Sequence, residues 1–376
     1  MSPKLKNFLS TAFVILSLAV VFTLVFSNPE LGNAWEALRK LNWGWTAVLF
    51  LCWAAYAGFD SLGVLIYLRK QGYALSPWRT LLATLIGFYY SNITPSAAGG
   101  QPMQIYSLRK AGVSVGYGTV AVSFRFICNQ FMACLISLVL FLANRDFVYA
   151  QLGDAIWFVR IGWVINFASV PLVLLAAFQR VLIQKLAQGI IRFLARIRLI
   201  RDPEASIARV SEMLDVYHTA MKELMGSVGR ILVQLLCSLL SQLALLSTVV
   251  FVYFAFGQSG TPAWRILTLS AMLYISASYT PLPGASGAQE GGFLLYFKGI
   301  FQNGTIGLAL LIWRFFTYYL FLIVGAITVL VEKITFRKEK AEEHTAKREG
   351  AADGEKTAKA GQPTGRDEAE KEEKPT

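Results

Sequence analysis

Long apolar stretches, separated by short polar segments, occupy most of the first 331 residues. A helix needs about 20 mainly apolar residues to cross the hydrocarbon core of a bilayer. Six stretches approach or exceed this length and predict full crossings: 9–26, 44–68, 117–143, 155–179, 230–256 and 305–331. Between the first two, residues 29–43 repeat Leu and Trp at three- and four-residue steps, which is typical of a short helix lying at the membrane surface.

Two further apolar stretches, 80–108 and 265–301, are interrupted at their centres. Proline removes a backbone donor and glycine lowers helix propensity, so neither centre suits a continuous helix. The interrupting residues are Pro95, Gly99, Gly100 and Pro102 in the first stretch, and Pro281, Pro283, Gly284 and Gly287 in the second. Broken backbone is tolerated at membrane depth only where protein or a water-filled cavity satisfies it. Both stretches therefore predict re-entrant helical hairpins.

The two interrupted stretches share a sequence pattern. Residues 95–101 read Pro-Ser-Ala-Ala-Gly-Gly-Gln, and residues 283–289 read Pro-Gly-Ala-Ser-Gly-Ala-Gln, without a gap. Arg125 lies 30 residues after the first proline, and Arg314 lies 31 residues after the second. We therefore expect the two arginines at equivalent positions of an internal repeat, each pointing at a hairpin tip near the membrane midplane.

An odd number of predicted crossings separates the repeats, so they have opposite orientations, as in many secondary transporters. The units cover about 1–145 and 150–334. The sequence thus predicts an all-α polytopic membrane protein with six transmembrane helices and two re-entrant helical hairpins, arranged as an inverted repeat.

Composition agrees with a membrane protein. Hydrophobic residues make up 55% of the chain and charged residues 15%, whereas soluble domains carry about 25% charged residues. The charge gathers at the end, since residues 332–376 hold 11 Lys/Arg and 12 Asp/Glu. We predict an integral membrane domain over 1–334 and a disordered charged tail over 335–376.

Basic residues give the expected orientation. Segments predicted on the cytoplasmic side before the tail hold 16 Lys/Arg, against five in the opposite connections. This positive-inside bias predicts a multi-pass protein of a bacterial-type cytoplasmic membrane, with both termini in the cytoplasm. The basic loop 180–229 then faces the cytoplasm, either attracted to anionic lipid or as an ordinary solvated connector.

Charged side chains within the predicted membrane segments are functional candidates, because inserting each costs at least about 2.5–3.5 kcal/mol. The candidates for a polar pathway that contacts a lipid headgroup are Glu290, Arg314, Arg125, Asp60, Gln101, Gln289 and Asn92. Each also has a structural alternative: Glu290 could cap a helix, the arginines could bind free carbonyls, and Asp60 could be neutralised by a neighbouring helix. The side-chain amides could instead form hydrogen bonds with backbone groups that the helix breaks leave free.

Glu290 and Arg314 are expected to meet, although they are 24 residues apart. A residue ten positions into a helix lies roughly 15 Å deep, which brings Arg314 to the depth of the hairpin tip. The pair would form the polar centre of the pathway, or else a static link between hairpin and helix.

Other chemistry finds no support in the sequence. The chain has two histidines, and its four cysteines lie within apolar runs without a CxxC pair. Neither a metal-ligand cluster nor a catalytic triad nor a nucleotide-binding motif is present in the sequence. We therefore expect no metal, no cofactor, no catalytic residues and no nucleic-acid partner.

Several of these residues carry a resemblance to one family. Asn92-Ile-Thr-Pro with the following Gly-Gly-Gln-Pro102, the segment from Pro281 to Glu290, and Arg314 followed by Thr317-Tyr-Tyr resemble the lysylphosphatidylglycerol synthase transmembrane region. This region is the flippase-like membrane half of the multiple peptide resistance factor. The resemblance covers roughly residues 8–334. One departure is Phe124, where the family often has Glu beside the arginine.

The resemblance implies translocation of an aminoacylated or otherwise modified phospholipid between leaflets, with bilayer phospholipids as partners. One alternative is phosphatidylglycerol lysyltransferase activity, which supports resistance to cationic peptides. It would require a separate lipid-modifying enzyme, since the soluble half that performs it in fused relatives would need more than the 45 residues that follow position 331. A second alternative is an ion-coupled small-solute transporter.

Overall fold

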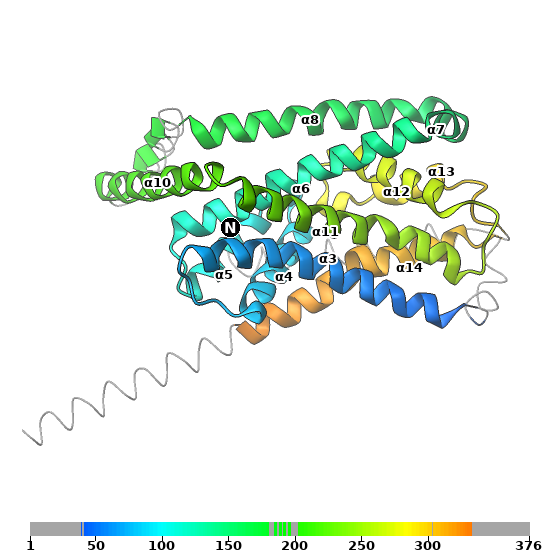
Figure 1. The fold of residues 1–376 in the computed structure, drawn as a ribbon, viewed down its shortest axis with the longest axis horizontal. Coiled ribbons are helices and arrows are strands. Elements are labelled where there is room, and N and C mark those ends of the chain that lie inside the picture. Colours follow the sequence, from blue (N-terminus) through cyan, green and yellow to red (C-terminus); the bar gives the residue numbers. More distant parts are fainter. Residues whose placement is uncertain are drawn as a thin grey trace, which may run out of the picture. The chain divides into compact units, whose positions relative to one another are not determined.

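The computed structural model describes residues 41–179, 202–302 and 304–332, together with Arg39 and isolated positions between 184 and 196. Within these ranges the regular elements are helices, and no strand occurs. The expected all-α class is therefore confirmed (Figure 1). The chain up to Ala326 forms one compact unit, and the residues from Ile327 form another.

Four helices in the described ranges are long and apolar enough to cross a membrane. They are α3 (Trp43–Lys70), α6 (Val115–Ala143), α11 (Val228–Ala255) and the helix Ile306–Glu332. Each coincides with one of the six predicted crossings. The last helix begins as α14, Ile306–Arg314, and passes through a π-helical turn, Phe315–Tyr319.

The other two predicted crossings are 9–26 and 155–179. Residues 9–26 and most of 29–43 lie outside the described residues. The stretch 155–179 folds as α8, Ile156–Phe178, an apolar helix of 23 residues that contains Pro171. Its passage across the membrane stays a prediction.

Both interrupted stretches fold as two helices joined through a break. The first hairpin consists of α4 (Pro77–Ile93), a 3-10 turn (Pro95–Ala97) and α5 (Gly100–Lys110). The second consists of α12 (Ala263–Ala277), a 3-10 turn (Pro283–Ala285) and α13 (Ala288–Tyr296). With 17, 11, 15 and 9 residues, the arms are shorter than the roughly 20 residues of a full crossing. The breaks fall at the predicted prolines, whereas the re-entrant depth of the hairpins stays a prediction.

The arms of the first hairpin touch closely. A Cβ added to Gly100 would lie 1.8 Å from the Ser91 hydroxyl oxygen and 2.7 Å from the Gly87 carbonyl oxygen, so only glycine permits this approach. One turn further, Gln104 Nε2 donates to Thr84 Oγ1 at 3.1 Å. The buried amide–hydroxyl bond joins the two arms at a place where water is excluded.

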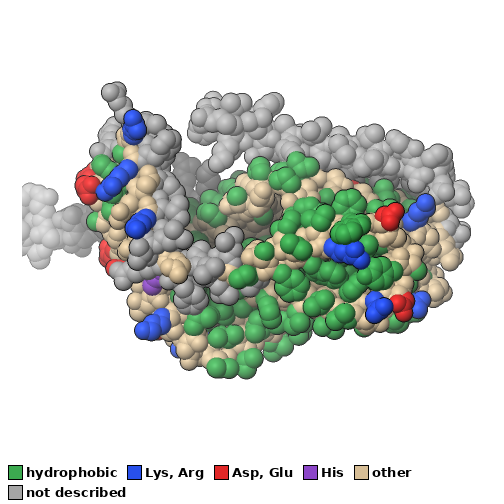
Figure 2. Space-filling model, turned by 90° about the horizontal axis from the view of Figure 1, so that it is seen from above, with side chains coloured by type: hydrophobic (Ala, Val, Ile, Leu, Met, Phe, Trp, Pro, Cys, Tyr) green, Lys and Arg blue, Asp and Glu red, His purple; other side chains and the backbone are tan. Residues whose placement is uncertain are grey.

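Helix α3 packs along α11, and their ribbons run side by side in Figure 1. The largest buried apolar cluster includes residues of α11, α12, α13 and α14, and Phe293 stacks on Trp313 at 5.0 Å within it. Large apolar side chains also point outward, such as Val139, Leu142 and Val164, which are 55%, 61% and 69% exposed. Figure 2 shows hydrophobic side chains spread over one face of the molecule. An apolar exterior of this extent suits a lipid environment.

Shorter helices complete the unit. Helix α7 (Arg145–Leu152) joins α6 to α8. Within the predicted loop 180–229, residues Pro203–Met225 form the amphipathic helix α10, which packs against α6. The loop is therefore partly an ordered helix, and the remainder of its basic stretch lies mostly outside the described residues.

We predict that Gly162→Ala lowers the thermal unfolding midpoint of the purified protein. Gly162 of α8 faces α12, and an added Cβ would lie 2.4 Å from the Ile275 backbone oxygen, which cannot move aside as a flexible side chain can. Overpacking of this kind costs about 1–3 kcal/mol. The control is Gly58→Ala in α3, where an added Cβ has no heavy atom within 4 Å. It should keep or raise the midpoint, since alanine favours helix over glycine by about 1 kcal/mol. Equal midpoints for the two variants would contradict the close packing of α8 on α12.

Candidate functional site

The tip of the second hairpin depends on a glycine. Gly284 has a φ of 61°, in the left-handed region that glycine adopts without strain. A Cβ at this position would also lie 2.1 Å from the ring of Tyr318. Conformation and close contact therefore both require Gly284, which lies in the 3-10 turn Pro283–Ala285.

Glu290 lies in the first turn of α13 and completes the start of that helix. Its Oε2 accepts a hydrogen bond from the Gly287 backbone N–H at 2.6 Å. The first N–H groups of a helix have no partner within it and carry a partial positive charge, so a carboxylate stabilises them. The expected capping role is thus present in the contacts of Glu290.

Arg314, the last residue of α14, meets the same carboxylate. Its Nε donates to Glu290 Oε1 at 2.6 Å, and its Nη2 lies 2.6 Å from the same oxygen. Nη2 also donates to the Gly284 carbonyl oxygen at 3.1 Å. The expected meeting of Glu290 and Arg314 is therefore confirmed as a contact, and Arg314 reaches the hairpin tip as predicted.

This ion pair is buried, with Glu290 1% exposed and Arg314 3% exposed. Removing one partner from such a pair leaves an uncompensated charge and costs about 3–5 kcal/mol. The backbone bonds to Gly284 and Gly287 add further partners to the two charged groups. The pair can therefore hold the hairpin against α14, and it places a cationic donor group at the tip.

A π-helical turn directly follows Arg314 and positions Tyr318. The Tyr318 ring lies 4.7 Å from the Arg314 guanidinium carbon, in cation–π range. Its hydroxyl donates to the Asn92 backbone oxygen at 3.3 Å. Tyr318 thus connects the arginine of the second hairpin's site to the end of α4 in the first hairpin, and π-helical turns are frequent at functional sites.

The two hairpin tips touch each other. The Ser96 backbone N–H donates to the Pro281 carbonyl oxygen at 3.0 Å. Ser96 and Ala97 have φ values of 51° and 53°, which are unfavourable for residues with a Cβ. Residues 95–98 are exposed, whereas the ion pair is buried. The first tip is therefore strained and exposed where it meets the second, whereas the Glu290–Arg314 pair beside the second tip is buried.

The three candidate amides have different surroundings. Asn92 takes part through its backbone oxygen, which binds Tyr318. Gln101 is half-buried at the start of α5. Gln289 lies beside Glu290, and its side-chain oxygen is buried without a hydrogen-bond partner in the described part of the chain. Gln289 is thus the amide that has an unused acceptor next to the ion pair.

Asp60 and Arg125 form a second buried ion pair between α3 and α6. Asn129 of α6 adds a hydrogen bond from Nδ2 to Asp60 Oδ1 at 2.6 Å. Arg125 Nε is buried without a hydrogen-bond partner among the described residues. The residue of a neighbouring helix that neutralises Asp60 is thus Arg125.

The expectation that Arg125 points at the first hairpin tip, as Arg314 does at the second, is wrong. Aligning the heptapeptides places Pro102 where the second repeat has Glu290, so the first tip offers no carboxylate. Arg125 is also one residue closer to its hairpin than Arg314, and one residue turns a helical side chain by about 100°. The guanidinium of Arg125 consequently binds Asp60.

Sequence reasoning missed Tyr318, Asn129 and the π-helical turn. Tyr318 had a usable signal, because it lies four residues after Arg314 and so on the same helical face. Asn129 stands in the same relation to Arg125. The π-helical turn had no such signal, because its residues Phe-Phe-Thr-Tyr-Tyr suit a regular helix in an apolar setting equally well.

Comparisons with known proteins agree with the predicted resemblance. A family model described as lysylphosphatidylglycerol synthase TM region matches residues 8–325. A relative named "UPF0104 membrane protein", from Archaeoglobus fulgidus, is 24% identical over 324 residues, which cover 84% of this chain and 94% of the relative. No solved structure matches the chain.

We expect the Asp60–Arg125 pair to be coupled in stability. Asp60→Asn leaves a buried guanidinium without its counter-charge, and Arg125→Met leaves a buried carboxylate; each should destabilise by about 3–5 kcal/mol. The double variant removes both charges and should recover most of this loss. The measurement is the free energy of unfolding of all four proteins in one detergent. Additive losses in the double variant would show that the two side chains do not interact.

Proposed function

The chain belongs to the family of lysylphosphatidylglycerol synthase transmembrane regions, and we propose that it moves a modified phospholipid between membrane leaflets. In this proposal the headgroup phosphate binds Arg314, and Glu290 is the group that it displaces. The observation that carries the proposal is the buried Glu290–Arg314 pair beside the second of the two contacting hairpin tips. Polar groups of this kind at broken helices build substrate sites in many transporters.

A phosphate suits Arg314 chemically. A guanidinium presents several N–H donors in a fixed plane and binds phosphate and carboxylate oxygens by the same geometry. Arg314 uses two of its nitrogens for Glu290 and one of them also for the Gly284 carbonyl. A phosphate could take the place of the carboxylate without a second cationic group, while the bond to Gly284 keeps the guanidinium at the tip.

Access to the pair requires the tips to separate. With Glu290 and Arg314 1% and 3% exposed, a headgroup reaches them only when the hairpins move. Two hydrogen bonds hold the tips in place, Ser96 to Pro281 and Tyr318 to Asn92. Breaking them on one side of the site at a time would give alternating access, with the acyl chains remaining in the bilayer.

Protonation of Glu290 offers a driving step. A neutral carboxylic acid binds Arg314 more weakly than a carboxylate does, so protonation favours the exchange of Glu290 for phosphate. Release of the proton after the lipid leaves would restore the ion pair. Movement of the lipid would then be linked to the proton gradient.

We propose movement and not synthesis of the lipid, because the contacts of the site join opposite charges and backbone groups. Acyl transfer instead needs a nucleophile positioned beside a base. A separate enzyme that modifies the headgroup would be a natural partner of such a translocator.

We predict that Glu290→Gln and Arg314→Gln insert into the membrane but lose about tenfold or more in lipid movement, since each removes a charge-assisted hydrogen bond. Arg314→Lys should also be impaired, because an ammonium keeps the charge but not the planar donor array. The assay follows fluorescent lipids of several headgroups across proteoliposome leaflets. Arg160→Gln is the matched control, because Arg160 stacks on Trp157 at 4.7 Å, away from these contacts.

Normal lipid movement in both Gln variants would refute the site. Failure of both variants to fold would assign the pair a purely structural role. Movement of a small solute in place of all tested lipids would favour an ion-coupled solute transporter.

An imposed proton gradient should accelerate lipid movement by the wild-type protein and leave Glu290→Gln without acceleration. The reason is that glutamine cannot be protonated in this pH range, so it cannot release Arg314 in response to protons. The measurement compares initial rates with and without the gradient at equal lipid composition. An equal response of both proteins would remove Glu290 from the coupling step.

A further inference from the structure

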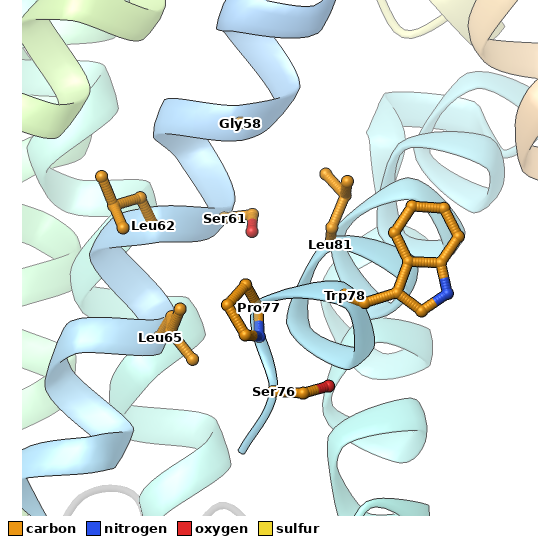
Figure 3. Close-up of a pocket in the computed structure, with 8 residues that line it drawn as sticks. All are labelled: Gly58, Ser61, Leu62, Leu65, Ser76, Pro77, Trp78 and Leu81. Carbon is orange, nitrogen blue, oxygen red and sulfur yellow. The ribbon is translucent and has the colours of Figure 1, made fainter.

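A second ligand-binding feature lies away from the ion pair, between α3 and the beginning of α4. It is a groove of about 470 Å³, lined by four residues of α3 from Gly58 to Leu65 and four residues from Ser76 to Leu81 (Figure 3). Ligand pockets for small molecules usually have volumes of about 300–1,000 Å³. The groove is therefore large enough to hold a segment of a flexible molecule.

The walls of the groove are mainly apolar. Leu62 and Leu65 project from α3, and Pro77 and Leu81 lie opposite on α4 (Figure 3). Leu62 is 38% exposed and Trp78, at the rim, is 64% exposed, so the groove opens to the exterior of the protein. Since α3 is long and apolar enough to cross the membrane, this exterior is hydrocarbon over most of its length.

A glycine keeps the groove open. A Cβ added to Gly58 would have no heavy atom within 4 Å, so the space over this residue is empty of protein. Gly58 and Leu65 are seven residues apart, or about 10 Å along the helix axis. An extended stretch of acyl chain fits this length.

One end of the groove is basic. Arg69 Nε donates to the Leu75 carbonyl oxygen at 2.9 Å, which places Arg69 beside the turn before Ser76. Lys70 follows Arg69 at the end of α3 and Arg79 lies in the first turn of α4, and all three basic residues are exposed. An apolar groove that ends at basic residues complements an anionic amphiphile, with the chain in the groove and the phosphate at the basic end.

We propose that the α3–α4 groove binds an acyl chain of an anionic phospholipid, whose phosphate faces Arg69, Lys70 and Arg79. The inference rests on the proposed function in that both take a phospholipid as ligand. It adds a second contact, for the tail of the lipid, on the first repeat of the chain.

The experiment uses the full chain in vesicles of phosphatidylcholine and phosphatidylglycerol, with a small fraction of phosphatidylglycerol that carries a diazirine on one acyl chain. After irradiation, labelled peptides are identified by mass spectrometry. We expect labelling at Gly58–Leu65 or Trp78–Leu81 above that of Val139 and Leu142, which are exposed on α6. Even labelling of all exposed apolar surfaces would overturn the proposal.

Gly58→Leu tests the groove itself. The added side chain fills the empty space, so labelling there should fall about tenfold, which corresponds to roughly 1.4 kcal/mol of binding free energy. Gly229→Leu is the matched control, since Gly229 is also a helical glycine with no heavy atom within 4 Å of an added Cβ. A monodisperse elution profile of both variants shows that they fold. Equal labelling of the two variants would overturn the proposal.

Two further experiments identify the molecule that occupies the groove. Phosphatidylcholine that carries the same diazirine chain should label the groove less than phosphatidylglycerol does, because a zwitterionic headgroup gains little from basic residues. In the double variant Lys70→Gln with Arg79→Gln, the two lipids should label the groove equally. Equal labelling by both lipids in the wild-type protein would overturn the anionic assignment. Crosslinking of residues 9–26 by benzoylphenylalanine placed at position 62 would show that the chain itself fills the groove, and would also overturn the proposal.

This test is separable from that of the ion pair. Arg314→Gln should lose lipid movement and keep groove labelling, whereas Gly58→Leu should lose labelling. If Arg314→Gln moved lipid normally, the proposed function would fail while labelling of the groove would still stand. If labelling failed to depend on position 58, the groove proposal alone would fall.

Discussion

The structure depends on one constraint, which is that backbone groups freed by a broken helix must find partners where water is scarce. At the second hairpin tip these partners are side chains: Arg314 binds the Gly284 carbonyl, and Glu290 binds the Gly287 N–H. The two charges then neutralise each other at 2.6 Å. The break in the helix and the ion pair therefore explain each other, because neither the free backbone groups nor the two charges would be stable when buried alone.

The same constraint links the hairpins. Ser96 donates to the Pro281 carbonyl, and the Tyr318 hydroxyl donates to the Asn92 backbone oxygen. Each of these bonds joins residues of the first hairpin to the second hairpin or to the helix after it, and satisfies a backbone group near a break. Because each is a single hydrogen bond to a neutral backbone oxygen, these are weaker attachments than the buried, charge-assisted ion pair. A movement of the tips would therefore break the inter-hairpin bonds before it disturbed Glu290 and Arg314.

The features that were predictable from sequence are those encoded locally. Pro95 and Pro283 lie in the breaks between the arms of the two hairpins, and four apolar stretches of sufficient length fold as long helices. The contact of Glu290 with Arg314 could be predicted from sequence, because the position of each residue along its apolar stretch follows from residue counts. The partner of Arg125 was not, because Asp60 is 65 residues away on another helix and only the packing of α3 on α6 brings them together. The π-helical turn likewise reflects tertiary packing around Tyr318 and not its own sequence.

The two similar sequence segments, 95–101 and 283–289, differ in the charged residues that follow them. The second repeat has Glu290 at the start of its second hairpin arm, and the first has Pro102 at the aligned position, so only one tip carries a charge pair. The first repeat instead pairs Asp60 with Arg125 inside the protein, while Ser61, the next residue of α3, lines the apolar groove. An amphipathic ligand needs one polar contact and one apolar contact at different places. The charged pair at the second hairpin tip and the apolar groove beside α3 are two such contacts at separate places.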